Sequence, residues 1–307
     1  MPGWSDVLNQ VLSQPGNLDN IRRQYITQLS NHTGRNVIVY YSGWLTSKNS
    51  NIDINDGDMI GFMNAVKDLD KAKGLDLIIH TPGGSPTATE GILNYLHSIF
   101  GNNIRSIIPH MAMSAGTLMA CSTSVIFMGK QSCLGPVDPQ FNGIAAYNIV
   151  KELEKAQEEL ALKPETREYW RLQLAKYPAA FTYTVYDAIE LSGQLLTQWL
   201  GKYMFGSLKS KAKKSLINKI VKGLNLNDGS HARHYDYEKC KELGLNVKLI
   251  EEDQVLQDLV LSVYHSFSIT AQTTSASKII ENQIGKAYIS HQQSLPPQFN
   301  RPQQDII

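Results

Sequence analysis

The chain has 307 residues, of which 42% are hydrophobic, enough for one large domain or two small ones around a substantial core. Its 29 Lys and Arg residues nearly balance 28 Asp and Glu residues, so net charge gives no reason to expect nucleic acid or an anionic membrane as partner. Three widely spaced cysteines without a CxxC pair argue against a disulfide scaffold or zinc knuckle and favour a reducing compartment. The sequence shows no basic-apolar leader and no run of about 18 apolar residues, so we expect a cytoplasmic protein without a membrane span.

The first part of the chain combines a helical lead-in with a buried strand. Residues 1–35 have apolar positions at helical spacing, and residues 37–41 form a short β-branched and aromatic run typical of a strand. Residues 53–58 have part of the pattern of a calcium loop, but the glycine falls one residue early and Asn64 occupies the expected glutamate position. We interpret this segment as the N-cap of the helix that follows it.

Strands and helices then alternate. The predicted strands are 75–79, 104–109 and 125–128, and the predicted helices are 87–100 and 113–121. This alternation indicates an α/β fold of parallel βαβ units. Chemistry is then expected where strands end and helices begin.

The remaining chain departs from this pattern. After a core over 36–145, we expect a helical extension over 146–225 and a return to the core over 226–289. This last part contains a predicted strand at 245–250 and a predicted helix over 254–267. Residues 290–307, rich in Gln and Pro, are predicted to form a flexible tail. The lysine-rich stretch 202–222 has the pattern of a basic amphipathic helix, which we interpret mainly as a solvated face rather than a nucleic-acid contact.

Two adjacent glycines follow the second strand. Without side chains, Gly83 and Gly84 allow backbone N–H groups to approach a ligand oxygen, as an oxyanion hole requires. A glycine-rich strand-to-helix turn of no catalytic consequence has the same pattern. No lysine follows in P-loop register and no GxGxxG is present, so we expect no nucleotide cofactor.

Ser114 lies where the third strand passes into a helix. Small residues on both sides allow a tight turn that exposes its hydroxyl near the positive end of the helix. The alternative is a serine that only caps the helix. The sequence contains only the second half of a GxSxG elbow.

These motifs occur in one compact block and in a fixed order. The matching words are His80–Gly84, Pro109–Thr117, Met128-Gly129 and Leu134–Gln140. Together they resemble the ClpP/crotonase superfamily, and most closely the serine dehydrogenase proteinase (SDH) family, related to signal peptide peptidase and NfeD-type serine proteases. The resemblance is strong over residues 36–145.

The resemblance implies a spiral of ββα units with a parallel sheet, plus the added helical region. It also implies Ser114 as nucleophile, and the amides of Gly83, Gly84 and Ala115 as oxyanion hole. The substrate would be a peptide or protein, and the assembly a homo-oligomer.

The general base is left open by the sequence. Where the proteolytic subunit of Clp places its histidine, residues 135–139 contain none. The NfeD and signal-peptide-peptidase relatives use a lysine from farther along the chain, which points to Lys151, with Lys155 four residues later on the same helix face. Both lysines also fit a solvated amphipathic helix. His231 and His110 are alternative bases.

Two further residues are candidates for supporting roles. His80 lies beside the proposed oxyanion hole and would orient its loop, and Asp138 would orient a base or fix an Asp-Pro turn. No group of His, Cys and carboxylate residues stands in ligand register, so we expect no metal ion and no cofactor.

The leading hypothesis is a serine endopeptidase whose chemistry needs no ATP. One alternative is a crotonase-type acyl-CoA enzyme, which is disfavoured because only Glu90 lies near the glycine pair. The other is a catalytically silent scaffold or interaction protein, which labelling of Ser114 with a fluorophosphonate would exclude.

Overall fold

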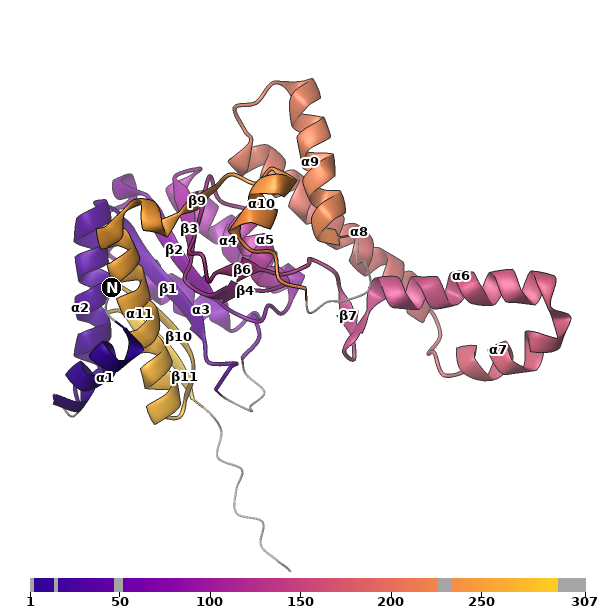
Figure 1. Ribbon diagram of the computed structural model, residues 1–307, viewed down its shortest axis with the longest axis horizontal. Helices are drawn as coiled ribbons and strands as arrows, with labels where there is room; N and C mark the ends of the chain where they lie inside the picture. Colours follow the sequence, from indigo (N-terminus) through magenta and orange to yellow (C-terminus); the bar gives the residue numbers. More distant parts are fainter. Residues whose placement is uncertain (1–2, 14–15, 47–51, 226–232, 292–307) are drawn as a thin grey trace, which may run out of the picture.

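A twisted seven-stranded sheet forms the centre of the computed structural model, which describes residues 3–13, 16–46, 52–225 and 233–291 (Figure 1). The strand order is β11-β10-β1-β2-β3-β5-β9. The strands are β1 (Asn36–Ser42), β2 (Leu75–His80), β3 (Ile104–Ile108), β5 (Ile126–Met128), β9 (Val247–Leu249), β10 (Ala276–Asn282) and β11 (Ala287–His291). From β1 to β9 neighbouring strands are parallel, whereas β10 and β11 add an antiparallel edge.

Helices cover both faces of the sheet. On one face lie α1 (Trp4–Ser13), α2 (Leu18–Thr33) and α11 (Gln254–Thr273); on the other lie α3 (Asp58–Val66), α4 (Pro86–Phe100) and α5 (Ala115–Cys121) (Figure 1). Every residue of β1 and β2 is buried, as expected for parallel strands covered on both sides. Along β1, Val37 and Val39 join the core with Phe267, while Ile38 and Tyr40 join the core with Phe62.

A second, smaller layer lies beyond the carboxyl ends of the strands. Parallel strands β4 (Met111–Ala112) and β6 (Cys133–Leu134) pair there, and Ala112 bridges to Thr81 just after β2. A hairpin of β7 (Gln140–Phe141) and β8 (Ile144–Ala145) leads into the next helix. The structure thus confirms an α/β fold of ClpP type with a mostly parallel sheet.

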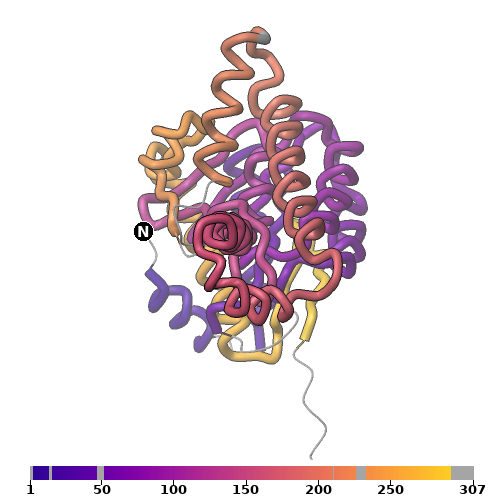
Figure 2. The backbone as a smooth tube through the Cα atoms, turned by 90° about the vertical axis from the view of Figure 1, so that its right-hand side faces the viewer, coloured from indigo at the N-terminus to yellow at the C-terminus, as the bar shows by residue number. Residues whose placement is uncertain are grey.

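The helices after β8 form an arm that leaves the body and returns. They are α6 (Ala146–Leu162), α7 (Arg167–Leu174), α8 (Phe181–Trp199), a π-helical turn (Leu200–Met204), α9 (Ser210–Asn225) and α10 (Tyr237–Leu243), with a short 3-10 turn at Pro164–Thr166. Two other 3-10 turns lie outside this region, at Lys71–Lys73 before β2 and at Ile250–Glu252 after β9. Figure 1 shows α6 and α7 projecting sideways, and in Figure 2 the same α6 is seen end-on in front of the body. Helix α8 packs against α6 and then continues into the core.

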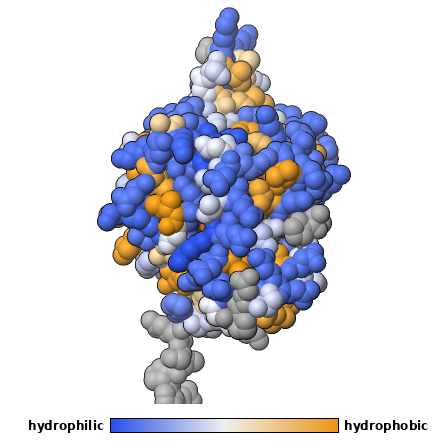
Figure 3. All heavy atoms as spheres, turned by 90° about the vertical axis from the view of Figure 1, so that its left-hand side faces the viewer, coloured by the Kyte–Doolittle hydropathy of each residue, from blue (hydrophilic) through white to orange (hydrophobic). Residues whose placement is uncertain are grey.

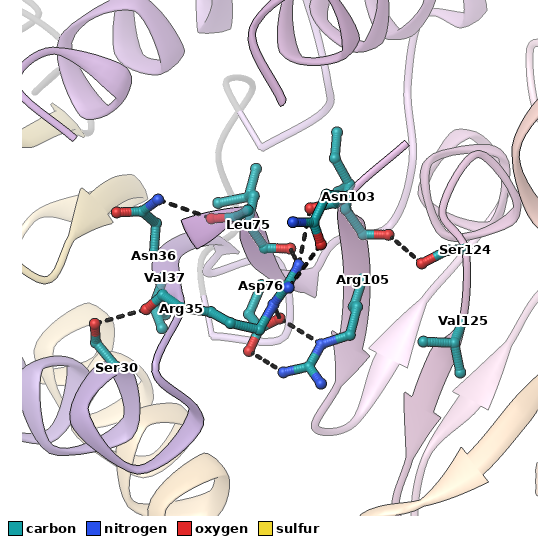
Figure 4. Close-up of polar contacts among 12 residues, drawn as sticks. Ser30, Arg35, Asn36, Val37, Leu75, Asp76, Asn103, Arg105, Ser124 and Val125 are labelled. Atoms are coloured by element: carbon teal, nitrogen blue, oxygen red, sulfur yellow. Dashed lines mark hydrogen bonds and ion pairs between the residues drawn. The ribbon is translucent and has the colours of Figure 1, made fainter. Parts of the chain in front are cut away.

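Buried charges clamp the amino-terminal end of the strands, opposite to the loops that follow β2 and β3. Asp76 is fully buried and accepts bonds from Arg105 Nε at 2.7 Å and Nη2 at 2.6 Å, and from Arg35 Nε at 2.7 Å (Figure 4). Bidentate pairing of this kind compensates a carboxylate that has lost its water. The cluster therefore holds β2 beside β3 at the end remote from the site described below.

The surface over α1, α2 and α11 is mostly hydrophilic, with apolar side chains in separate small groups (Figure 3). No described helix is both long and apolar enough to cross a lipid bilayer.

The structure differs from the sequence-based expectations in the late helix, the edge strands, the start of α3 and the predicted tail. The late helix continues six residues beyond 267, to Thr273, and the antiparallel pair β10–β11 was not predicted. Helix α3 begins at Asp58 after Gly57 without any side-chain cap, so the N-cap interpretation of residues 53–58 is wrong. Of the predicted tail, residues 290 and 291 belong to β11, and 292–307 lie outside the described residues.

Candidate active site

A cavity of about 500 Å³ opens at the carboxyl ends of the parallel strands. It brings together the loop after β2, the start of α5, the segment after β6 and one side of α8. The lining residues are Asp53, Pro82, Gly84, Pro86, Ser114, Ala115, Leu118, Val137, Asp138, Pro139, Gln140, Phe141, Ala188, Leu191 and Ser192. This is the position in which open α/β sheets bind ligands.

Ser114 has a strained backbone conformation. Its φ is 50° and its ψ is −116°, a combination that residues with a side chain rarely adopt. The residue immediately precedes α5, yet its side chain does not cap that helix. The capping alternative is therefore not observed, and a sharp turn that presents a serine at the start of a helix is the geometry of an exposed nucleophile.

Close backbone approach explains the small residues around this turn. A Cβ on Gly83, whose φ is 106°, would lie 2.8 Å from the carbonyl oxygen of Met113 and 2.8 Å from Cβ of Ser114. A Cβ on Gly116 would lie 2.4 Å from Cγ2 of Thr81. The loop after β2 and the start of α5 can pack this tightly only because both positions are glycine.

Main-chain hydrogen bonds cross-link the same two loops. The N–H of Thr81 donates to the carbonyl of Met111 at 3.1 Å, and the N–H of Met113 donates to the carbonyl of Thr81 at 3.0 Å. The glycine turn is thereby held in register with the residue that precedes Ser114.

The two glycines use their polar groups differently. The N–H of Gly83 donates to Oγ1 of Thr81 at 3.1 Å, and its carbonyl accepts from the N–H of Ile54 at 2.7 Å. Because C=O and N–H point in opposite directions in a trans peptide, the N–H of Gly84 is turned away from Ile54. In the described part of the chain, the N–H groups of Gly84 and Ala115 donate to no protein acceptor. Two free donors thus lie beside Ser114 at the cavity wall.

The predicted lysine bases lie away from this wall. Lys151 and Lys155 are both exposed on α6, and neither lines the cavity. The side chain of Lys155 is 66% exposed, with its Nζ 4.0 Å from Oε1 of Glu159 on the same helix. Within the described ranges, the cavity lining contains no lysine, arginine or histidine; its ionisable groups are Asp53 and Asp138.

The candidate histidines His80 and His110 belong to an aromatic cluster that is separate from the cavity lining. His80 is buried and stacks on Tyr41 and His110, and Nδ1 of His110 lies 2.9 Å from Oη of Tyr264. Burial, with a smaller contribution from His110, lowers the pKa of His80 to about 3, and burial also lowers the pKa of His110. His80 is therefore a neutral ring in this cluster, and its role in orienting the loop stays a prediction. His231 lies outside the described residues.

Asp138 lies in a tightly anchored segment. It is buried and lines the cavity. The neighbouring Val137 donates its N–H to the carbonyl of Leu224 at 2.9 Å, and Pro139 accepts from the N–H of Ala146 at the same distance. The segment is thus fixed against the ends of α9 and α6.

Two parts of the wall were not predicted from the sequence. One is Asp53, whose pKa burial raises against the opposing effect of Lys278. The other is α8, which contributes Ala188, Leu191 and Ser192. The acidic run around Asp53 was a visible signal, but it was interpreted only as a possible cation loop or cap; no signal in the sequence marks α8.

A mostly parallel sheet covered by helices, with a serine at the turn between a strand and a helix, is the architecture of ClpP-like α/β proteins. Residues 17–165 match the model of the ClpP-like SDH-type serine proteinases. Two relatives in Methanocaldococcus jannaschii are the uncharacterized proteins MJ0137, 31% identical over 210 residues, and MJ1495, 29% identical over 196 residues. These alignments cover 68% and 64% of this chain, and 65% and 59% of the relatives. The chain therefore spans less than two thirds of the length of either protein.

Proposed function

We propose that the protein is a serine endopeptidase that cleaves peptide bonds through an acyl-enzyme on Ser114. The observation that carries this proposal is the strained Ser114 at the start of α5, facing a cavity beside the free N–H groups of Gly84 and Ala115. Preorganised donors of this kind stabilise the charge that develops on a carbonyl oxygen during acyl transfer. The family of the matched segment supports the same chemistry.

The reaction follows from these positions. Oγ of Ser114 attacks the scissile carbonyl carbon while its proton passes to a general base, and the oxyanion receives hydrogen bonds from Gly84 and Ala115. Gly83 contributes through its carbonyl, which orients the peptide unit that contains the Gly84 N–H. The C–N bond then breaks, the amine leaves with the proton, and water hydrolyses the serine ester.

The base is proposed to be Lys151, supplied by a second copy of the chain. Lys151 lies on the projecting α6, outside the cavity of its own chain. The arm also exposes large apolar side chains that a monomer has no reason to present: Leu162 is 72% and Tyr183 75% exposed. An assembly that buries this arm would place a lysine in a dry site, where its pKa falls toward the range a base needs.

Labelling with a fluorophosphonate probe tests the nucleophile. The expected result is modification confined to Ser114, located by mass spectrometry, and lost in Ser114→Ala. Ser192→Ala is the matched control, since Ser192 lines the same cavity from α8. Failure to label Ser114 in any assembly state would instead favour the silent scaffold, the alternative that the lack of a base in the described cavity supports.

Mixing variants tests the base. Ser114→Ala and Lys151→Ala should each be inactive alone, and an equimolar mixture should recover peptide hydrolysis because one chain supplies Ser114 and the other Lys151. Lys155→Ala, which keeps both Ser114 and Lys151, is the control and should be active alone. No recovery in the mixture would assign the base to the same chain, and activity of Lys151→Ala alone would assign it to another residue, Lys155, His231 or His110.

The acyl-CoA alternative is less well supported by the cavity. A coenzyme A ligand carries several phosphate charges, and cations usually hold such groups. The described cavity wall contributes two carboxylates and no cationic side chain. Peptide turnover without binding of acyl-CoA would separate the two activities.

A further inference from the structure

The oxyanion turn is bracketed by a segment that comes from far earlier in the chain. Ile54 forms an isolated parallel bridge with Gly84, donating its N–H to the carbonyl of Gly83 at 2.7 Å and accepting from the N–H of Ser85 at 2.9 Å. The fit is close: a Cβ on Gly84 would lie 2.4 Å from both N and O of Ile54. The orientation of the Gly83–Gly84 peptide therefore depends on where Ile54 lies.

A buried ion pair holds the residues on either side of Ile54. Nζ of Lys278, in β10, donates to the carbonyl of Asp53 at 2.7 Å and to Oδ1 of Asp58 at 2.7 Å. Lys278 is 1% and Asp58 2% exposed. Oδ2 of Asp58 accepts from Oη of Tyr40 at 2.8 Å and from the N–H of Asn55 at 3.1 Å. The pair thus fixes the backbone immediately before and immediately after Ile54.

Stability alone is a weak reason for such a pair. Two charges removed from water lose much hydration, and well-packed apolar residues of similar size are often equally stabilising. What apolar residues cannot supply is a directed donor to the Asp53 carbonyl and a directed acceptor for the Asn55 N–H. Those two bonds are the ones that determine where Ile54 lies.

Resting on the function proposed above, we infer that Lys278 and Asp58 are positioning residues of the oxyanion hole. They act through Ile54 on the Gly83–Gly84 peptide and so direct the Gly84 N–H toward the oxyanion. Neither residue touches the reacting atoms. The acidic segment 53–58 accordingly serves as the outer support of the catalytic turn rather than as a cation loop.

The test compares rates rather than amounts of labelling. The double variant Lys278→Met/Asp58→Asn loses the donor to the Asp53 carbonyl and keeps an amide oxygen as acceptor for the Asn55 N–H. Both charges are removed, so no single charge is left buried. We expect the folded fraction to label to completion on Ser114, but with a rate constant lowered about 10- to 100-fold. This is less than the 10²- to 10³-fold loss typical of a missing oxyanion donor, because the Gly84 N–H is displaced rather than removed. The fraction of labelled sites and the rate constant are measured separately by active-site titration and by the time course.

The matched control uses the other buried ion pair of β10. Arg22→Met/Glu281→Gln removes a pair that is likewise fully buried but binds α2 on the opposite face of the strand. Its rate constant should stay within about twofold of wild type, below the effect of one hydrogen bond. Should Lys278→Met/Asp58→Asn not fold, Tyr40→Phe removes one bond to Asp58 and should slow labelling a few-fold.

The outcomes are distinct. A wild-type rate constant in the double variant, with only the labelled fraction reduced, would show a merely structural role and overturn the inference while leaving the proposed function intact. An equal loss in the control would also overturn it. Absence of labelling in the wild type would overturn the proposed function and this inference together.

Discussion

Replacing Gly84 by alanine should disable the oxyanion turn while leaving most of the fold in place. The new Cβ would lie 2.4 Å from backbone N and O of Ile54, which cannot rotate away as a side-chain tip would. The φ of 147° adds backbone strain of about 1–3 kcal/mol in a residue with a Cβ. The turn must therefore shift, taking the Gly84 N–H away from the oxyanion, and loss of one such donor typically costs about 10²- to 10³-fold in rate.

The assay measures the rate constant for fluorophosphonate labelling of Ser114 together with the urea midpoint of unfolding. Gly101→Ala is the control, because Gly101 also has a positive φ, 59°, but has nothing within 4 Å of its missing Cβ. Gly101→Ala should lose about 1–3 kcal/mol of stability, because its φ of 59° and ψ of −134° are rarely adopted by residues with a side chain, and it should keep the wild-type labelling rate. If Gly84→Ala also keeps the wild-type rate, the Gly84 N–H is not an oxyanion donor and the reasoning is refuted.

Three further predictions concern stability and reactivity. His80 has a folded-state pKa of about 3 against about 6.5 when unfolded, so the unfolded chain binds more protons and stability should fall as pH decreases from about 6.5 toward 3. His80→Phe, which keeps a ring for stacking and cannot be protonated, should flatten that pH dependence in urea titrations; an unchanged slope would contradict the assignment. Asp76→Ala should cost about 3 kcal/mol of unfolding free energy, because Arg35 and Arg105 lose their partner, yet leave the labelling rate of folded protein unchanged; a slower rate would contradict the separation of the two ends of the sheet. Cys121, Cys133 and Cys240 are free and buried, so a thiol reagent should modify them only as the protein unfolds, and rapid reaction in the native state would contradict their burial.

The parallel part of the fold can be predicted because each of its strands is a short apolar run that is visible in the local sequence. Strand β2 is an apolar and β-branched run interrupted at Asp76 and ended by His80. The turns that follow β2 and precede α5 contain their glycines and serine in the sequence itself. Strand β10 gives no such signal. Its Lys278, Glu281 and Asn282 are polar, and they are buried only because Asp58, Arg22 and the Ala65 carbonyl meet them from far along the chain.

The candidate site likewise has parts that the local sequence predicts and parts that it does not. The nucleophile and the glycine turn are contiguous motifs, whereas the cavity wall from α8 and the bracket around Ile54 exist only after distant segments meet. The N-cap interpretation of residues 53–58 failed for this reason: the Asp58 carboxylate is directed to Lys278, Tyr40 and the Asn55 N–H rather than capping α3. A base cannot be identified from a local motif when its partner lies on another element or another chain.

The nucleophile and oxyanion turn lie within one chain, whereas the proposed base comes from another, and this difference affects how the proposed activity would be controlled. Buried pairs and main-chain bonds fix the Ser114 turn and its two free N–H groups within one chain, so these parts are ready before any partner arrives. The proposed base, in contrast, lies on an arm that contributes only its α8 side to the cavity. A serine without a base is a poor nucleophile, since almost all of its hydroxyl groups stay protonated. Under the proposal, an isolated chain would therefore be a preorganised but inert site, and peptide hydrolysis would rise with protein concentration more steeply than in direct proportion.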